Sequence, residues 1–220
     1  MKGIFITFEG GEGSGKSTQA KALFRYLKRR PGAGRGKRVL LTREPGGTLL
    51  ADAIRRLLVV RSREETLPET ELFLYTAARF QHLSRVIRPE LDRGTIVLCD
   101  RFADATIAYQ QYGRRLPPRV VKTCNALATG GLKPDITFFL DVPPETGLQR
   151  AHRRMGGRQR AEKKEDRFER ESLAFHHRVR AGYRTLARKE RHRIHLIDGT
   201  APSAVVFEKI LEVLRRHEIF

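Results

Sequence analysis

Short apolar segments alternate with longer stretches of helical spacing along most of this chain. The apolar segments are nearly uninterrupted, which is typical of strands that are buried on both faces of a parallel sheet. Between them, apolar residues recur every three or four positions, as they do on one face of a helix. The segments that predict strands are 3–8, 38–44, 95–101, 135–142 and 193–198, and those that most clearly predict helices are 16–30, 49–60 and 69–92.

Strands that alternate with helices predict an α/β fold, because the crossovers between parallel strands pack helices on both faces of the sheet. The five apolar segments therefore predict a five-stranded parallel sheet. A length of 220 residues fits one domain, residues 1–220. Residues 153–167 are almost entirely polar and include glycines, so we expect a mobile segment that emerges from a helix.

The cysteines and the N-terminal sequence indicate the cellular compartment in which the protein is expected. Cys99 and Cys124 are too few for a zinc site, and both lie among apolar neighbours, as thiols do in a reducing compartment. No N-terminal apolar segment is long enough for a signal peptide, and no run approaches the length of a membrane span. We therefore expect a cytoplasmic protein that does not enter a membrane.

The formal net charge is +19, and much of it lies between residues 150 and 193, where 16 Lys or Arg face 6 Asp or Glu. A basic surface can bind nucleic acid through its phosphates. It can equally attract nucleotides or be a solvated helical face. That segment has no nucleic-acid-binding motif and no interleaved aromatic residues, so we expect no specific nucleic acid as partner.

The most informative stretch is a glycine-rich loop that stands between a predicted strand and a predicted helix. Gly10, Gly15, Lys16 and Ser17 match the complete phosphate-binding pattern GxxxxGKS. Glycines let backbone N–H groups converge on a phosphate, Lys16 can bridge the β- and γ-phosphates, and Ser17 can ligate Mg²⁺. A glycine turn that only packs between strand and helix is the weaker alternative. The residues predicted to bind ATP are Gly10, Gly11, Glu12, Gly13, Ser14, Gly15, Lys16, Ser17 and Thr18.

This loop alone does not identify the acceptor, because GTPases, ATPase motors and small-molecule kinases share it. The chain has no NKxD stretch of the kind that reads guanine and no room for a second long domain. These features favour a kinase with a small acceptor.

Five stretches occur in the order and approximate spacing of one family: "FEGGEGSGKSTQ", "TREPGGT", "AARFQH", "DRFADATIAYQ" and "DRFE". The chain resembles the thymidylate kinases from its N-terminus to about residue 200. The resemblance implies the three-layer fold of P-loop nucleoside monophosphate kinases and transfer of the γ-phosphate of ATP to dTMP, in the synthesis of dTTP. It also implies Mg²⁺ as cofactor and a homodimer that pairs through helices flanking the sheet.

The resemblance implies roles for residues of the acceptor site. Arg79 and Arg101 would hold the acceptor phosphate, Tyr75 would stack on the base, Thr106 would hydrogen-bond the base, and Tyr109 would crowd the 2′ position of the sugar. Three of these residues have a plainer alternative: a surface position for Arg79, core packing for Tyr75 and a structural ion pair for Arg101.

Two further groups follow from the resemblance. Arg43 and Pro45, in the "TREPGGT" turn, would shape the acceptor site, although the turn can also serve only as a bend. The residues predicted near Mg²⁺ are Ser17, Asp100 and Glu9.

Glu12 places a carboxylate in the phosphate loop, where the family carries Asp or Glu facing the acceptor sugar. At the next position, one subgroup of the family has arginine, and the other has glycine and supplies catalytic arginines from the lid. Gly13 places this chain in the second subgroup. The predicted catalytic residues are therefore Lys16 and Arg101 together with lid arginines.

The lid, at about residues 150–167, is basic and several residues longer than is usual in the family. Arg153 is the first choice for the residue that reaches the transferred phosphate, and Arg167 of "DRFE" is the second. The other candidates in the lid are Arg150, Arg154, Arg158 and Arg160.

Two alternatives to a thymidylate kinase remain open at this point. One is a kinase for another nucleotide or for a deoxynucleoside. The paired Arg79 and Arg101 favour a phosphorylated acceptor instead, and Tyr109 favours a deoxy sugar. The other is a basic nucleic-acid-binding ATPase, which the net charge of +19 motivates.

Overall fold

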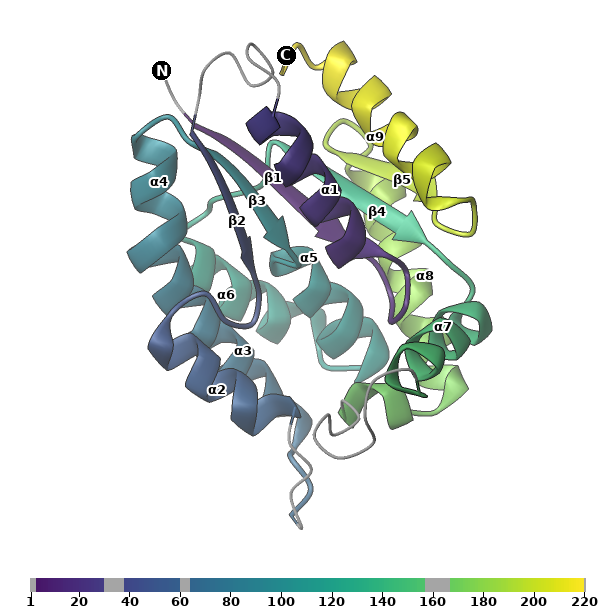
Figure 1. The fold of residues 1–220 in the computed structure, drawn as a ribbon. Coiled ribbons are helices and arrows are strands. Elements are labelled where there is room, and N and C mark those ends of the chain that lie inside the picture. The colour runs from purple at the N-terminus through teal and green to yellow at the C-terminus, as the bar shows by residue number, and fades with distance from the viewer. Residues whose placement is uncertain (1–2, 30–37, 60–63, 157–166, 220) are drawn as a thin grey trace.

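Five parallel strands form the centre of the computed structural model, which describes residues 3–29, 38–59, 64–156 and 167–219 (Figure 1). The strands run in the order β2-β3-β1-β4-β5, and every neighbouring pair is parallel. All five coincide with the apolar segments of the sequence, so the predicted sheet is confirmed. The strands are β1 (Ile4–Glu9), β2 (Val39–Arg43), β3 (Ile96–Asp100), β4 (Ile136–Asp141) and β5 (Ile194–Asp198).

Each strand ends on a charged residue at the same edge of the sheet. The strand ends of β2 and β3 are directly paired, Arg43 with Asp100, and those of β4 and β5 are paired as Asp141 with Asp198. The central strand β1 lies between β3 and β4. The chain therefore builds one half of the sheet on one side of β1 and the other half on its other side. An open α/β sheet binds its ligands at such a switch point, beyond the carboxyl ends of the strands.

One face of the sheet is covered by α1 (Lys16–Arg29) and α9 (Ser203–Arg216), which lie on the viewer's side in Figure 1. Alternate strand residues point to this face because successive side chains of a strand point in opposite directions. The side chains of Leu23 and Ile210, fully buried, pack against Phe8 and Leu98 of the sheet. Hydrophobic burial on this face fixes the helix that begins at the phosphate loop.

The opposite face is covered by α8 (Leu173–Lys189) and by a long helical run before β3. The sequence predicts one helix over residues 69–92, and the structure has a continuous run with a change of geometry. It consists of α3 (Pro68–His82), a π-helical segment at Leu83–Ile87 and α4 (Arg88–Asp92). Pro89 lacks a backbone N–H and cannot sustain a regular α-helical ladder, which accounts for the irregularity just before it.

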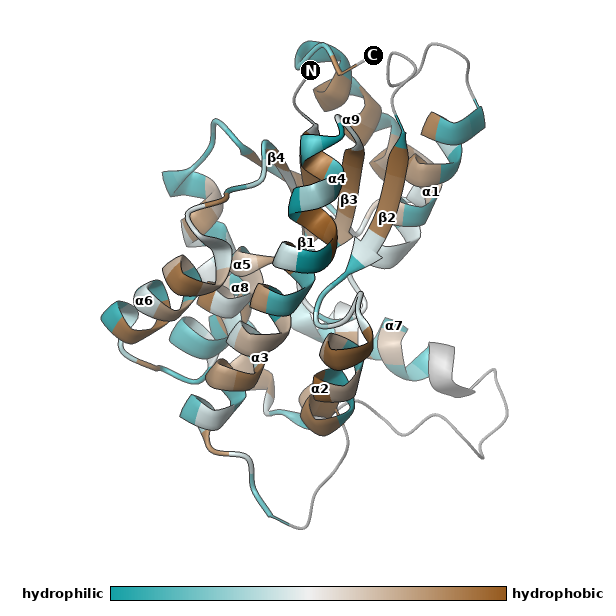
Figure 2. Cartoon of the chain, turned by 90° about the vertical axis from the view of Figure 1, so that its left-hand side faces the viewer, coloured by the Kyte–Doolittle hydropathy of each residue, from teal (hydrophilic) through white to brown (hydrophobic). Residues whose placement is uncertain are grey.

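A third group of helices extends beyond the carboxyl edge of the sheet. Here α3 packs between α2 (Leu49–Val59) and α6 (Pro118–Thr129). The connection from β3 to α6 contains α5 (Ala103–Thr106) and a π-helical segment at Ile107–Gly113. Apolar residues are visible on the outer sides of α2, α3 and α6 in Figure 2.

The predicted lid lies between α7 (Pro144–Gly156) and a short 3₁₀ turn, η3 (Arg167–Arg170). Residues 157–166, including Arg158 and Arg160, lie outside the described residues, so the lid and the single-domain boundary stay predictions. Within the described part of the chain, no helix is both long and apolar enough to span a membrane.

Candidate active site

The phosphate loop connects β1 to α1, as the sequence predicts. Gly10, Gly13 and Gly15 have φ angles of 145°, 63° and 95°, in a region that residues with side chains rarely adopt. The buried Lys16 donates from Nζ to the carbonyl oxygen of Gly11 at 2.8 Å, so its side chain folds back over the loop. Burial and the nearby charge of Arg101 lower the pKa of Lys16 to about 8.

The loop is in direct backbone contact with α7, the helix that leads into the lid. A Cβ atom on Gly13 would lie 1.9 Å from the carbonyl oxygen of Gly147, and a Cβ atom on Gly147 would lie 2.3 Å from that of Glu12. Neither glycine can therefore carry a side chain without a shift of the loop or of the helix. An arginine at position 13 does not fit this arrangement, and the supply of catalytic arginines from the lid stays a prediction.

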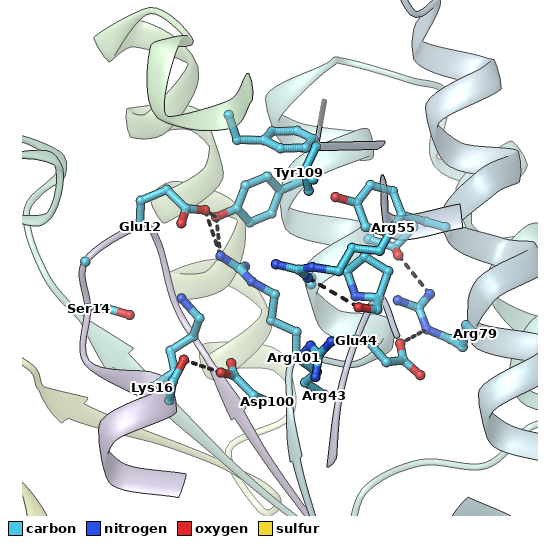
Figure 3. Close-up of a pocket in the computed structure, with 18 of the residues that line it drawn as sticks. Glu12, Ser14, Lys16, Arg43, Glu44, Arg55, Arg79, Asp100, Arg101 and Tyr109 are labelled. Carbon is cyan, nitrogen blue, oxygen red and sulfur yellow. Dashed lines mark hydrogen bonds and ion pairs between the residues drawn. The ribbon is translucent and has the colours of Figure 1, made fainter. Parts of the chain in front are cut away.

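One pocket extends from the phosphate loop to α3 (Figure 3). It brings together most of the predicted site, namely Glu12, Gly13, Ser14, Gly15, Lys16, Ser17, Thr18, Arg43, Pro45, Tyr75, Arg79, Asp100, Arg101, Thr106 and Tyr109. The sequence reasoning gave no binding role to six other lining residues, which are Glu44, Arg55, Val59, Ala105, Gln110 and Phe168.

Glu12 and Arg101 form an ion pair at the end of the pocket next to the phosphate loop. Arg101 Nη2 donates to Glu12 Oε1 at 2.7 Å, and the hydroxyl of Tyr109 donates to the same oxygen at 2.7 Å. Burial alone would raise the pKa of Glu12, but Arg101 and Lys16 lower it to about 2, so this carboxylate is ionised at neutral pH. Arg101 has a φ of 72°, which is strained for a residue with a side chain and is typical of functional sites.

Glu9 does not line the pocket, in contrast to the other two predicted metal residues. It is fully buried, and its oxygens accept hydrogen bonds from the backbone N–H of Phe102 and from the hydroxyl of Tyr183, each at 2.7 Å. Burial, with the charge of Asp104 adding to it, raises the pKa of Glu9 to about 8. This placement gives no support to a direct role of Glu9 at the metal.

Ser17 and Asp100 do lie together, because the Ser17 hydroxyl donates to Asp100 Oδ2. A hydroxyl and a carboxylate are hard oxygen ligands of the kind that Mg²⁺ prefers. In the described ranges, no group of three or more His, Cys, Asp or Glu side chains could hold a metal by itself. A Mg²⁺ ion here would therefore take its remaining ligands from water and from the phosphates of a nucleotide.

Arg79 lies at the opposite end of the pocket from the phosphate loop and is buried among protein acceptors (Figure 3). Its guanidinium donates to Glu44 at 2.7 Å, to Thr106 at 2.8 Å, to Asn125 at 2.9 Å and to the carbonyl oxygen of Phe102 at 3.0 Å. These bonds occupy four of its five N–H groups. A bidentate grip on the acceptor phosphate, which the sequence predicts for Arg79, is therefore not available in this arrangement.

Two other guanidinium groups, those of Arg43 and Arg55, lie between Arg101 and Arg79 (Figure 3). Arg43 pairs with Asp52 at 2.8 Å near the surface, and Arg55 donates to the carbonyl oxygen of Pro45 at 3.3 Å. Sequence reasoning missed Arg55 because it looks like any polar residue on the outer face of a helix.

Three aromatic rings line the same pocket. The ring centroid of Phe168 lies 5.7 Å from that of Tyr109 and 6.3 Å from that of Tyr75. Tyr75 thus packs against a neighbouring ring and also faces the pocket, which combines both interpretations of the sequence. Phe168 belongs to "DRFE", where the sequence reasoning considered only the arginine.

The structure describes the side chains of only some of the lid arginines. Arg150 donates to the carbonyl oxygens of Gly199 at 2.8 Å and of Thr200 at 3.1 Å, which holds it to the turn after β5. Arg153 lies exposed on α7. The side chains of Arg154 and Arg167 lie outside the described part of the structure, so their predicted roles remain untested.

The Glu12–Arg101 pair predicts a specific pH dependence of stability. A carboxyl whose pKa is depressed in the folded state stabilises the fold above its unfolded pKa of about 4.5, and this contribution is lost as the pH falls toward its folded pKa of about 2. We expect the difference in unfolding free energy between wild type and Glu12→Gln to be largest near neutral pH and to shrink below about pH 4.5. Denaturant titrations across this range measure it, and a difference independent of pH would contradict the ion pair.

Comparisons with known proteins show which family this chain resembles. A family profile described as thymidylate kinase matches residues 8–210. The chain is 49% identical over 211 residues to a thymidylate kinase of Trichlorobacter lovleyi and 50% identical over 212 residues to one of Nitratidesulfovibrio vulgaris, with 96% of each chain covered in both cases.

A solved structure gives the same result at the level of the fold. The crystal structure of thymidylate kinase from Ehrlichia chaffeensis superposes with a TM-score of 0.74 at 35% identity, covering 97% of this chain and 99% of the other. The family match and the relatives span nearly the whole chain, and the chain belongs to the thymidylate kinase family.

Proposed function

We propose that this protein transfers the γ-phosphate of ATP to dTMP and yields ADP and dTDP. The observation that carries the proposal is one continuous pocket that joins the phosphate loop to the Glu12–Arg101–Tyr109 cluster. A phosphate donor and an acceptor can therefore meet without a change of site. Membership of the thymidylate kinase family selects dTMP among the possible acceptors.

On the donor side, the loop N–H groups and the N-terminus of α1 would bind the phosphates of ATP. Lys16 would exchange the Gly11 carbonyl for phosphate oxygens, since an anion is a stronger partner for its ammonium group than a carbonyl is. Ser17 and Asp100 would hold Mg²⁺, which neutralises charge on the transferring group when it is bound.

On the acceptor side, an oxygen of the dTMP phosphate attacks the γ-phosphorus in line, and the bond to the ADP oxygen breaks. This oxygen needs no general base, because a phosphate monoester with a second pKa of about 6 is already mostly ionised at neutral pH. Arg101, Arg43 and Arg55 would together place that phosphate. In this proposal Arg43 and Arg55 replace Arg79, for which the role was first predicted. Catalysis is then positioning and charge neutralisation.

The nucleoside of dTMP would occupy the remainder of the pocket. Glu12 and Tyr109 would face the sugar, where the Glu12 carboxylate can accept a hydrogen bond from a hydroxyl. Tyr75 and Phe168 offer ring faces for the base. Thr106 and Arg79 offer polar groups for its edge.

A homodimer is the second part of the proposal. Three adjacent helices, whose ribbons carry hydrophobic stretches in Figure 2, expose large apolar side chains that an isolated chain would leave in water. These are Leu49, Leu50 and Leu57 on α2, Phe73 and Phe80 on α3, and Val120 and Leu127 on α6. A second copy of the chain can cover them by the same face, as a two-fold interface requires. The cytoplasmic location stays a prediction.

The acceptor is tested with an ADP-release assay on dTMP, dUMP, UMP, CMP and thymidine. We expect the highest kcat/KM for dTMP. Faster turnover of thymidine or CMP would assign the chain to another kinase class. Hydrolysis of ATP that needs no nucleoside and is stimulated by DNA would instead favour a nucleic-acid-binding ATPase.

Arg153 is tested by replacement with alanine. If Arg153 contacts the transferred phosphate, we expect Arg153→Ala to lower kcat by on the order of 10³, with a much smaller change in KM for dTMP. The matched control is Arg191→Ala, which removes an exposed arginine from the turn before β5. A nearly normal kcat for Arg153→Ala would move the role to another lid arginine.

The dimer is tested by light scattering coupled to size exclusion. We expect wild type to have twice the 25.2 kDa mass of one chain, and Leu127→Glu to shift toward the mass of one chain, because it places a charge in the apolar interface. Leu196→Glu changes a leucine on β5 that is also exposed but lies away from these helices, and this variant should stay dimeric. A monomeric wild type would overturn this part of the proposal.

A further inference from the structure

Asn125 lies on α6 behind the pocket and does not line it, yet it contacts the pocket through Arg79. Its Oδ1 accepts a hydrogen bond from Arg79 Nη1 at 2.9 Å, and its Nδ2 donates to the carbonyl oxygen of Ala103 at 3.1 Å. Both ends of the buried amide are therefore engaged, which fixes its orientation. Asn125 thus links α6, the helix α3 that carries Arg79, and α5.

Arg79 is left with one N–H group for a ligand. Nε donates to Glu44, both N–H groups of Nη1 are taken by Thr106 and Asn125, and Nη2 gives one N–H to the carbonyl oxygen of Phe102. Among the described residues, the second N–H of Nη2 has no partner. Arg79 lines the pocket although its side chain is only 2% exposed, so this N–H is a single buried donor held in a rigid frame.

A single fixed donor distinguishes the two common pyrimidines. Thymine carries a carbonyl oxygen at C4, which accepts a hydrogen bond, whereas cytosine carries an amino group there, which donates one. Opposite Arg79, the amino group would leave two donors facing each other in a buried site, and unmet buried donors are costly. The contact of Arg79 with Thr106 places this donor beside the residue assigned to the base.

We propose that Asn125 is a positioning residue that makes the enzyme reject 4-amino pyrimidines, because it holds the guanidinium of Arg79 in one orientation. The inference rests on the proposed function, since it takes dTMP as the acceptor. Glu44 neutralises the charge of Arg79 and also contacts His82 at 3.2 Å, so its loss would leave a buried cation unpaired. Asn125 is neutral, so its replacement frees the orientation of the Arg79 guanidinium without leaving a buried charge unpaired.

The test compares dTMP with dCMP as acceptors for the Asn125→Leu and Asn125→Ala variants. We expect the ratio of kcat/KM for dTMP to that for dCMP to fall about tenfold, which corresponds to the loss of one buried hydrogen bond. KM for dTMP should rise and KM for ATP should stay unchanged, because the phosphate loop is not in contact with Asn125. The alanine variant removes the same contacts without adding volume, which covers the case in which leucine prevents folding.

Two control variants separate positioning from general damage to α6. Asn125→Asp keeps the acceptor for Arg79, whereas it loses the donor to Ala103 and adds a negative charge next to the guanidinium, so it should retain most of the discrimination. Thr129→Val removes a hydrogen bond to the Gly131 backbone at the end of the same helix and should leave the ratio at the wild-type value. An aspartate variant as unselective as the leucine variant, or a ratio lowered equally by Thr129→Val, would overturn the proposal.

The failure of this inference can be told from a failure of the proposed function. A wild-type enzyme that prefers dTMP, together with Asn125→Leu and Asn125→Ala variants that keep the full preference, would refute the role of Asn125 alone. A wild-type enzyme that does not phosphorylate dTMP would refute both.

Discussion

The ion pair between Glu12 and Arg101 holds the two halves of the site together. Glu12 belongs to the phosphate loop after β1, and Arg101 follows the last residue of the neighbouring strand β3. Both side chains are largely removed from water, and a buried charge is tolerated only when a partner of opposite sign lies within hydrogen-bonding distance. The hydroxyl of Tyr109 contacts both members of the pair from a third element, so three segments of the chain are held together at this end of the pocket. The strained backbone of Arg101 persists because these contacts determine where its guanidinium lies.

The phosphate loop is fixed from its other side by backbone contact rather than by charge. Gly13 and Gly147 approach so closely that neither tolerates a Cβ atom, which couples the loop to α7. A long side chain at position 13 of the loop is therefore excluded by the backbone of α7. Arg150, near the middle of α7, is already committed to the turn after β5 and helps to hold the helix. α7 is thus held both to the phosphate loop and to the turn after β5.

The sequence predicts the sheet and the phosphate loop well, because both depend on local patterns. The five apolar runs coincide with the five strands, and three of the four glycines of the loop, Gly10, Gly13 and Gly15, have positive φ angles. Long-range contacts decide what the sequence does not predict. The partners of Arg79 come from the turn after β2, from α5 and from α6, and no local pattern identifies them. Glu9 is the last residue of a strand like Asp100, yet it is fully buried, and burial raises its pKa although the hydroxyl of Tyr183 on α8 donates a hydrogen bond to it.

The distribution of charge explains where an anionic acceptor group fits best. Glu12 neutralises Arg101 at one end of the pocket, and Glu44 neutralises Arg79 at the other. Between them, Arg43 pairs with Asp52 only at the surface, and of the described residues Arg55 contacts a backbone carbonyl rather than a carboxylate. Besides Lys16, which contacts a loop carbonyl, the least compensated positive charge therefore lies in the middle of the pocket. A phosphate placed there would have guanidinium groups on several sides and would lie next to the loop that holds its donor, whereas a neutral base would be favoured at the compensated end beside Arg79.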